Sequence, residues 1–138
     1  MEILVTKKIL GGAVPQDLDD TDPCPIAPVV ELVFGRWTSH VLWTLANHGR
    51  MRFGELREHI PAVTPKVLTQ RLRQLERDGF ISRAYHPEMP PRVEYECTSL
   101  AISLRPIFTR IVEWSDAHLD DVREARRQFD GGVAADRA

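Results

Sequence analysis

The segment Thr64–Asp78 constrains the fold more than any other part of this sequence. It reads TPKVLTQRLRQLERD and is followed by Gly79. Threonine is a good helix N-cap, proline is tolerated at the first helical position, and glycine is common just after a helix. Leu68, Leu72 and Leu75 recur at the spacing that places side chains on one face of a helix. The sequence therefore predicts an amphipathic helix over Thr64–Asp78.

The opposite face of this helix carries hydrogen-bond donors and positive charge. Gln and Arg side chains can each make two hydrogen bonds to a base edge, and Lys or Thr can hold a phosphate. The alternative is a solvated helix surface without a ligand. Arg71 lies nearer the leucine stripe and is expected to be structural or to contact a phosphate. The candidate DNA contacts of the segment are Thr64, Lys66, Thr69, Gln70, Arg73 and Arg77.

The sequence on either side favours a winged helix-turn-helix. Met51–Ile60 predicts a short helix, and the brief link after it requires a tight crossing of two helices. Ile81–His86 and Arg92–Cys97 alternate with a period of two, which predicts two strands. The tip between them, PEMPP, cannot continue a strand because three of its five residues lack an N–H. Two strands joined by such a tip form a β-ribbon, the wing of a winged helix.

Two shorter helices precede this motif. The apolar residues from Ile26 to Phe34 predict a short helix with Pro28 in its first turn. A second helix is predicted over Thr38–Ala46, with Trp37 as a large anchor beside it. The expected fold class is therefore mainly α with a small β-ribbon.

A long helix is predicted over Leu100–Glu124. Pro106 lies within it and should kink it, because proline removes one backbone hydrogen bond. The apolar surface of this helix is wider than one small core needs, which indicates burial on a second side against another subunit. The alternative is core packing within one chain. The residues of this stripe assigned to a dimer interface are Ile107, Phe108, Ile111, Trp114 and Leu119.

Length and composition indicate one domain with flanking segments. A chain of 138 residues can bury a core without metal or disulfide support, and it contains no run of eighteen apolar residues. We expect a partly flexible N-terminal extension at 1–23, an ordered domain at 24–124 and a disordered tail at 125–138. The two cysteines are too few for a disulfide framework, which favours a reducing, cytoplasmic location.

The distribution of charge favours a nucleic-acid partner, although the total does not. The chain carries 18 Lys and Arg against 20 Asp and Glu, a formal net charge of −2. Residues 36–98 hold ten Lys and Arg against seven Asp and Glu. The excess positive charge is thus confined to the winged-helix part of the sequence.

At the base of the wing, Arg92 is placed to reach a minor groove or a phosphate. The alternative for Arg92 is an ion pair with a neighbouring glutamate, such as Glu94 or Glu96. His86 is a second candidate DNA contact. The five histidines have no metal-ligand spacing, and no carboxylate pair or nucleophile–base arrangement is recognisable. We therefore expect no catalytic residue, no metal and no cofactor.

With these features in place, the chain resembles the HxlR family of bacterial transcriptional regulators, a winged-helix branch related to MarR-type regulators. The resemblance covers roughly Cys24 to His118. Ser99 and Ala101 stand where the family often has a glutamate and a glycine, and the N-terminal extension is longer than many members carry. The motifs, in order, are CP at 24–25, GRW at 35–37, RFGEL at 52–56, LTQRL at 68–72, LE at 75–76, DG at 78–79 and PPRVEY at 90–95.

The resemblance implies a homodimer with a recognition helix at Thr64–Asp78, a wing at His86–Arg92 and dimerisation through the first and last helices. In the first helix this implicates Ile26 and Val30. In relatives that sense electrophiles or oxidants, a cysteine at the position of Cys24 acts as the sensor.

Cys24 has two interpretations. It precedes the first predicted helix, where amide dipoles favour the thiolate form of a cysteine. It is therefore a candidate sensor, and the alternative is a small packing residue in the dimer interface. A thiol enzyme built on Cys24 is disfavoured because no base accompanies it in the same motif. Cys97 alternates with Val93 and Tyr95 and is expected to point into the core.

The sequence thus predicts a homodimeric, sequence-specific DNA-binding regulator, a repressor acting by occlusion of a palindromic operator in double-stranded DNA. An electrophile, an oxidant or a small ligand is left open as the effector. The alternative is a winged-helix module for protein–protein interaction without specific DNA binding. Such a module should expose apolar or acidic residues on the recognition helix, where this chain has Lys66, Gln70 and Arg73.

Overall fold

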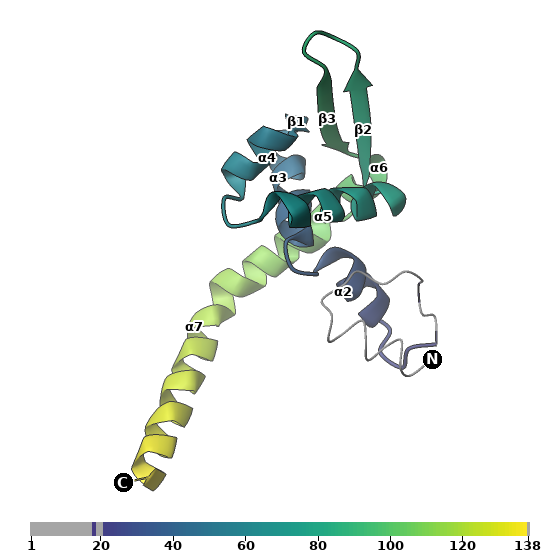
Figure 1. The fold of residues 1–138 in the computed structure, drawn as a ribbon. Helices are drawn as coiled ribbons and strands as arrows, with labels where there is room; N and C mark the ends of the chain where they lie inside the picture. The colour runs from purple at the N-terminus through teal and green to yellow at the C-terminus, as the bar shows by residue number, and fades with distance from the viewer. Residues whose placement is uncertain (1–17, 19–20, 138) are drawn as a thin grey trace. The chain divides into compact units, whose positions relative to one another are not determined.

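The computed structural model describes Leu18 and residues 21–137, with backbone only for 134–137 (Figure 1). The chain divides into two compact units, one ending at Ser103 and the other beginning at Leu104. Most of the predicted N-terminal extension lies outside the described residues. No helix among the described residues has the length and apolar character needed to cross a membrane.

The first unit contains five helices among its described residues, and a three-stranded sheet. The helices follow the order expected for a winged helix-turn-helix, and the prediction of a mainly α fold with a small β-ribbon is confirmed. Pro28 lies in the first turn of its helix, as predicted. The helices are α2 (Ala27–Val33), α3 (Thr38–His48), α4 (Phe53–His59), α5 (Pro65–Arg77) and α6 (Ser99–Ile102).

Helix α5 begins and ends where the sequence predicts. The Thr64 hydroxyl accepts a hydrogen bond from the backbone N–H of Val67 at 3.2 Å, which satisfies one of the unpaired amides of the first turn. Gly79 follows the helix with φ of 83°, a left-handed conformation that glycine adopts without steric cost. The leucine stripe, Leu68, Leu72 and Leu75, is buried.

The sheet contains one strand that the sequence analysis missed. β2 (Ile81–His86) and β3 (Arg92–Cys97) pair antiparallel as predicted, and β1 (Met51–Arg52) pairs with β3 on its other side. The prediction of helix from Met51 is therefore wrong by two residues. Met51 is buried in the core and pairs with Tyr95, and α4 begins two residues later, at Phe53.

The core of this unit lies between α3, α4, α5 and the sheet. Its largest fully buried side chains come from α2, α3, α4, α5 and the turn before α5. Trp37, predicted as an anchor, is half-buried and caps α3 with a left-handed φ of 70°. Its ring lies beside His40, at 4.9 Å between ring centroids, and under the Arg36 guanidinium.

The predicted long helix is interrupted before Pro106. It forms α6 and then, after Ser103 and Leu104, α7 (Arg105–Arg137), in which Pro106 occupies the first turn. A continuous helix would require an N–H that Pro106 lacks and would press its ring against the carbonyl of the preceding turn. The proline is accommodated by a new helix start instead of a kink.

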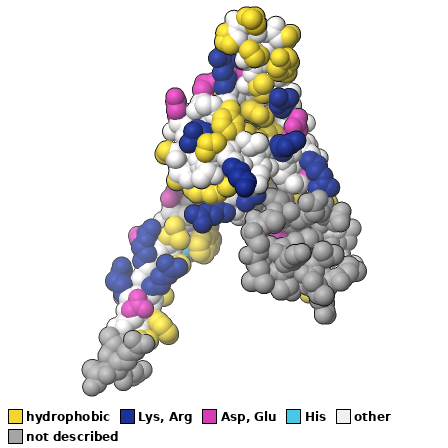
Figure 2. Space-filling model, viewed as in Figure 1, with side chains coloured by type: hydrophobic (Ala, Val, Ile, Leu, Met, Phe, Trp, Pro, Cys, Tyr) yellow, Lys and Arg dark blue, Asp and Glu magenta, His cyan; other side chains and the backbone are white. Residues whose placement is uncertain are grey.

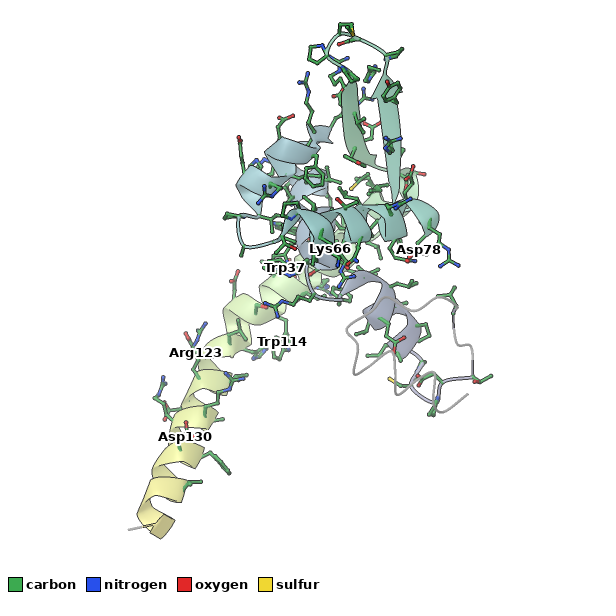
Figure 3. All side chains as sticks on the ribbon, in the orientation of Figure 1. Trp37, Lys66, Asp78, Trp114, Arg123 and Asp130 are labelled. Carbon is green, nitrogen blue, oxygen red and sulfur yellow. The ribbon has the colours of Figure 1, made fainter. Side chains whose placement is uncertain are left out.

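The prediction of a disordered tail from residue 125 is wrong as far as Arg137, because α7 continues through that segment. An ion pair with i,i+3 spacing links the extra turns to the predicted helix, between Arg127 and Glu124 at 2.6 Å, and a similar pair, Arg123 with Asp120 at 2.7 Å, lies just before them. Such exposed pairs each contribute a few tenths of a kcal/mol. Figure 3 marks Trp114, Arg123 and Asp130 along this helix.

We expect Thr64→Ala to lower the free energy of unfolding by about 1 kcal/mol, because it removes the N-cap acceptor of α5. Urea denaturation would measure the change. Thr69→Ala is the matched control: its exposed hydroxyl bonds the Pro65 carbonyl within the same helix, so a loss within about 0.5 kcal/mol is expected. Equal losses for the two variants would show that the cap does not stabilise α5.

Candidate nucleic-acid interface

The polar face of α5 is exposed and its long side chains are unengaged. Among the described residues, Lys66, Gln70, Arg73 and Arg77 make no hydrogen bond or ion pair, and all four are exposed. Lys66 and Asp78 mark the two ends of the helix in Figure 3. No exposed large apolar side chain belongs to α5. The face therefore has the donors that a DNA groove requires and lacks the apolar surface expected of a protein-docking helix.

Thr64 and Arg71 each have a structural partner. The Thr64 hydroxyl caps the helix, as described above. The Arg71 Nε donates a hydrogen bond to the backbone carbonyl of Arg36 at 3.1 Å, which ties α5 to the turn before α3. Arg71 is thus structural, one of the two roles expected for it.

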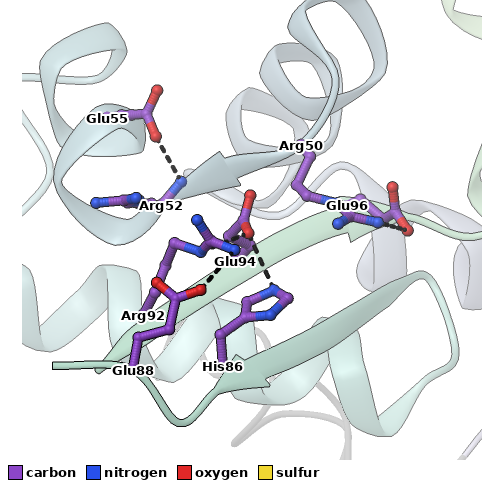
Figure 4. Close-up of polar contacts among 8 residues, drawn as sticks. All are labelled: Arg50, Arg52, Glu55, His86, Glu88, Arg92, Glu94 and Glu96. Atoms are coloured by element: carbon purple, nitrogen blue, oxygen red, sulfur yellow. Dashed lines mark hydrogen bonds and ion pairs between the residues drawn. The ribbon is translucent and has the colours of Figure 1, made fainter. Parts of the chain in front are cut away.

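On the wing, His86 and Arg92 converge on a single carboxylate (Figure 4). The Glu94 Oε1 lies 3.0 Å from His86 Nε2 and 3.0 Å from Arg92 Nε. Arg92 also pairs with Glu88 at 3.3 Å. The ion-pair alternative considered for Arg92 is therefore the arrangement in the structure, and both predicted wing contacts are engaged within the wing.

A second ion pair lies further along β3, between Arg50 and Glu96 at 3.1 Å (Figure 4). The hydrogen bond to Glu96 and the charge of that carboxylate raise the pKa of Arg50 above its ordinary value. Both residues of the pair are about half exposed, so solvent screens the charges and the pair adds little to stability.

The strand register divides the β2–β3 ribbon into two faces. Directly paired residues of antiparallel strands share a face, and successive pairs alternate. His86 is paired with Arg92, and Glu94 and Glu96 lie on that same face, which we call the ion-pair face. The other face carries the pairs Ile81–Cys97, Arg83–Tyr95 and Tyr85–Val93. Ile81 is buried there, and the Cys97 thiol lies 3.8 Å from the Leu42 carbonyl, so Cys97 points toward the core as predicted.

A hollow of about 400 Å³ lies between α5 and this second face of the ribbon. Arg83 and Tyr95 enter it from the strands, and Arg73 enters it from the helix. The hollow also contains an acidic group, Glu76, which the analysis of the helix face did not include. Figure 2 shows Lys and Arg side chains spread over the near side, where α5 lies, with apolar atoms at the tip of the wing. The lining residues are Thr69, Leu72, Arg73, Glu76, Arg83 and Tyr95.

Arg83 was missed in the sequence analysis, although a signal for it exists. It lies two residues after buried Ile81, so period-two alternation places it on the face that leads to the core. A charged, exposed residue at such a position indicates that the strand extends beyond the core and that this face is open to solvent there.

Cys24 is exposed and lies before the helix, not in its first turn. The N-cap of α2 is Ile26, two residues later, and the backbone N–H of Cys24 donates to Asp22 Oδ1 at 2.8 Å. Cys24 therefore lies outside the first turn of α2, and its position does not meet the expectation that the amides of this helix act directly on the thiol.

Most residues assigned to a dimer interface are exposed in the single chain. On α2, Ile26 is 65% exposed and Val30 is 42% exposed. Phe108 departs from the assignment, since it is 7% exposed and its side chain is not part of an open stripe. The remaining assigned residues, all on α7 and 37–55% exposed, are Ile107, Ile111, Trp114 and Leu119.

Comparison with known proteins gives one consistent result. The family model described as HxlR-like helix-turn-helix matches residues 32–123. The uncharacterised HTH-type transcriptional regulator YdeP of Bacillus subtilis (strain 168) is 36% identical over 117 residues, which are 83% of this chain and 91% of the relative. An uncharacterised HTH-type regulator of Methanothermobacter thermautotrophicus is 43% identical over 96 residues, 70% of this chain and 72% of the relative.

Solved structures give the same answer. The redox regulator HypR in its reduced form has a TM-score of 0.68 at 31% identity and covers 73% of this chain and 99% of its own. The reduced form of the transcriptional regulator YodB from B. subtilis has a TM-score of 0.63 at 31% identity, covering 69% and 93%. These relatives are regulators and not enzymes. The chain belongs to the HxlR-like helix-turn-helix family of DNA-binding transcriptional regulators.

Proposed function

We propose that this regulator binds a palindromic operator as a homodimer, with α5 in the major groove, and represses transcription by occluding the DNA. The observation that carries the proposal is the exposed and unengaged row of Lys66, Gln70, Arg73 and Arg77 on a helix whose opposite face is buried. Thr69 is exposed on the same face.

In this arrangement the capped N-terminus of α5 approaches the DNA, as recognition helices of helix-turn-helix proteins do. A dimer would present two such helices about 34–36 Å apart, one helical turn of DNA, which is why a two-fold operator is expected. The wing would lie beside the groove. Because Glu94 engages both His86 and Arg92, those two side chains contact DNA only when they leave this carboxylate.

A second subunit is supported by the exposed apolar side chains of α2 and α7. Large apolar side chains recurring along one helix are costly to leave in water and commonly mark an interface. On α7, Ile107, Ile111 and Trp114 recur at helical spacing and are each about half exposed.

Regulation through Cys24 is a further part of the proposal. The thiol is exposed and lies next to α2, one of the two helices assigned to the dimer interface. HypR has been solved in reduced and oxidised forms, and YodB in reduced and diamide-treated forms. An adduct or a disulfide between subunits at Cys24 would shift one subunit against the other and change the spacing of the recognition helices. In the alternative, Cys24 packs in the interface and a small ligand, or no ligand, is the effector.

Base reading by α5 is tested by selecting bound duplexes from a random pool and then measuring variants on the selected site. Gln70→Ala should cost about 1–3 kcal/mol on that site and relax its sequence preference, because an amide can pair with a base edge. Lys66→Ala should weaken all sequences alike and flatten the salt dependence. Recovery of no common sequence, or equal and sequence-independent losses for both variants, would contradict base reading by this face.

The dimer is tested by Ile111→Glu and Trp114→Glu, which place a charge in the apolar stripe of α7. Each should give a folded monomer with weakened binding to a full operator, measured by sedimentation and by DNA binding. Thr109→Glu is the control, since it adds the same charge to an exposed position on the other side of the helix. A wild-type protein that is monomeric at micromolar concentration and still binds a palindrome tightly would contradict the proposal.

The sensor role is tested by operator binding of wild type and Cys24→Ser, with and without diamide or an aldehyde. We expect the wild type alone to lose or gain affinity on treatment. Mass spectrometry should locate the modification at Cys24. An equal response of both proteins, or no response from a wild type shown to be modified at Cys24, would assign the residue to packing.

A further inference from the structure

We propose that the hollow between α5 and the ribbon is a binding site for a DNA backbone phosphate, held between the guanidinium groups of Arg73 and Arg83. The inference rests on the proposed function, because it requires α5 to face DNA. It assigns the main DNA contact of the wing to Arg83 in place of His86 and Arg92. It also moves Arg73 from base reading to backbone contact.

The cations on the two faces of the ribbon differ in whether a carboxylate engages them. Arg92 and His86 lie on the ion-pair face, where Glu94 holds both within 3.0 Å. Arg83 lies on the opposite face, is exposed, and makes no hydrogen bond or ion pair among the described residues. Arg83 is therefore a ribbon cation whose charge no carboxylate in the described part of its own chain neutralises by direct contact.

Arg83 lies beside the exposed side of the recognition helix. It lines one hollow together with Arg73 and Thr69, which lie one turn apart on the exposed side of α5. A helix that lies in a major groove is flanked by the two sugar–phosphate backbones, so a cation beside the helix meets phosphate before it meets a base edge. A strand residue facing the side of α5 occupies that flanking position.

The side chains that line the hollow supply donors suited to an anion. Two guanidinium forks from different elements match the geometry of a phosphate, which accepts paired hydrogen bonds. The Tyr95 hydroxyl, which has no partner among the described residues, is a further donor within the hollow. Thr69 is not, because its hydroxyl already donates to the Pro65 carbonyl at 2.8 Å. A hollow with two such cations and a phenol is a better fit for an anion than for a neutral base edge.

Glu76 places a negative charge in the hollow, and this charge should repel a bound phosphate. Its carboxylate lines the same hollow and forms no ion pair with Arg73 or Arg83 among the described residues. A negative charge near a bound phosphate weakens binding. Removal of this charge should therefore tighten DNA binding, whereas most substitutions at a DNA interface weaken it.

The test measures binding of a fluorescent mixed-sequence duplex by the full-length protein over a range of salt concentrations. A phosphate contact is independent of sequence, so no operator is needed. Arg83→Ala and Arg73→Ala should each weaken binding by roughly tenfold and reduce the salt slope, and the double variant should show the full loss of roughly 0.9 for each phosphate that the protein no longer neutralises. Because both arginines hold one phosphate, the double variant should show a smaller decrease in affinity than the sum of the two single decreases.

Two further variants make the test specific. Glu76→Gln should bind the same duplex more tightly, with a gain that shrinks as salt is raised. Arg92→Ala, which removes a ribbon arginine from the ion-pair face, should leave the salt slope unchanged. Arg126→Ala on α7 controls for the removal of one positive charge, and thermal unfolding confirms that each variant is folded.

The outcomes separate this inference from the proposed function. If Arg83→Ala behaves like Arg126→Ala while Gln70→Ala still relaxes sequence preference, the phosphate site is refuted and the function stands. If Glu76→Gln weakens binding and relaxes preference, Glu76 reads a base and the hollow does not hold a phosphate. A wild type that binds no duplex refutes the proposed function itself.

Discussion

The burial of three leucines on α5 is the interaction on which the arrangement of this regulator depends. Leu68, Leu72 and Leu75 are at most 2% exposed, and each contributes about 1.5–3 kcal/mol by leaving water. Because the helix repeats every 3.6 residues, burying this stripe forces the face with Gln70 and Arg73 outward. The same contacts that stabilise the fold therefore orient the groups that meet DNA, and the orientation needs no ligand to be established.

Much of the fold could be predicted because its signals are local. The cap at Thr64, the stop at Gly79 and the two six-residue strands each depend on a few neighbouring residues. The elements that were predicted wrongly depend on contacts beyond their immediate neighbours in the sequence. Met51 and Arg52 form a strand only because β3 offers a partner, and two residues are too short to show a period. The turns of α7 beyond Glu124 were not predicted because Gly131 and Gly132 favour disorder, although Arg127 pairs with Glu124 at the start of those turns.

The same difference between local signals and distant contacts applies to the candidate site. The exposed residues of α5 were predicted from helical periodicity, and their exposure agrees with it. On the wing, residue type alone suggested His86 and Arg92, but the strand register decides which side chains share a face. That register brings both residues to Glu94 and leaves Arg83 on the side of α5. Alternation within one strand indicates which of its residues share a face. It does not indicate which residues of the neighbouring strand lie on that face, because this depends on the register between the strands.

The alternation of the ribbon determines which insertions and deletions the wing can accept. A shift of pairing by one residue would turn β3 over relative to β2, so the carboxylates of Glu94 and Glu96 would face α5 on the same side as Arg83. Residues can be inserted or deleted in the tip at 87–91 without such an exchange, since the tip lies outside the ladder. A single insertion inside β3 would reverse the polarity of the surface beside the recognition helix. The length of the tip can therefore change without altering the surface beside the recognition helix, whereas the parity of the strand register cannot.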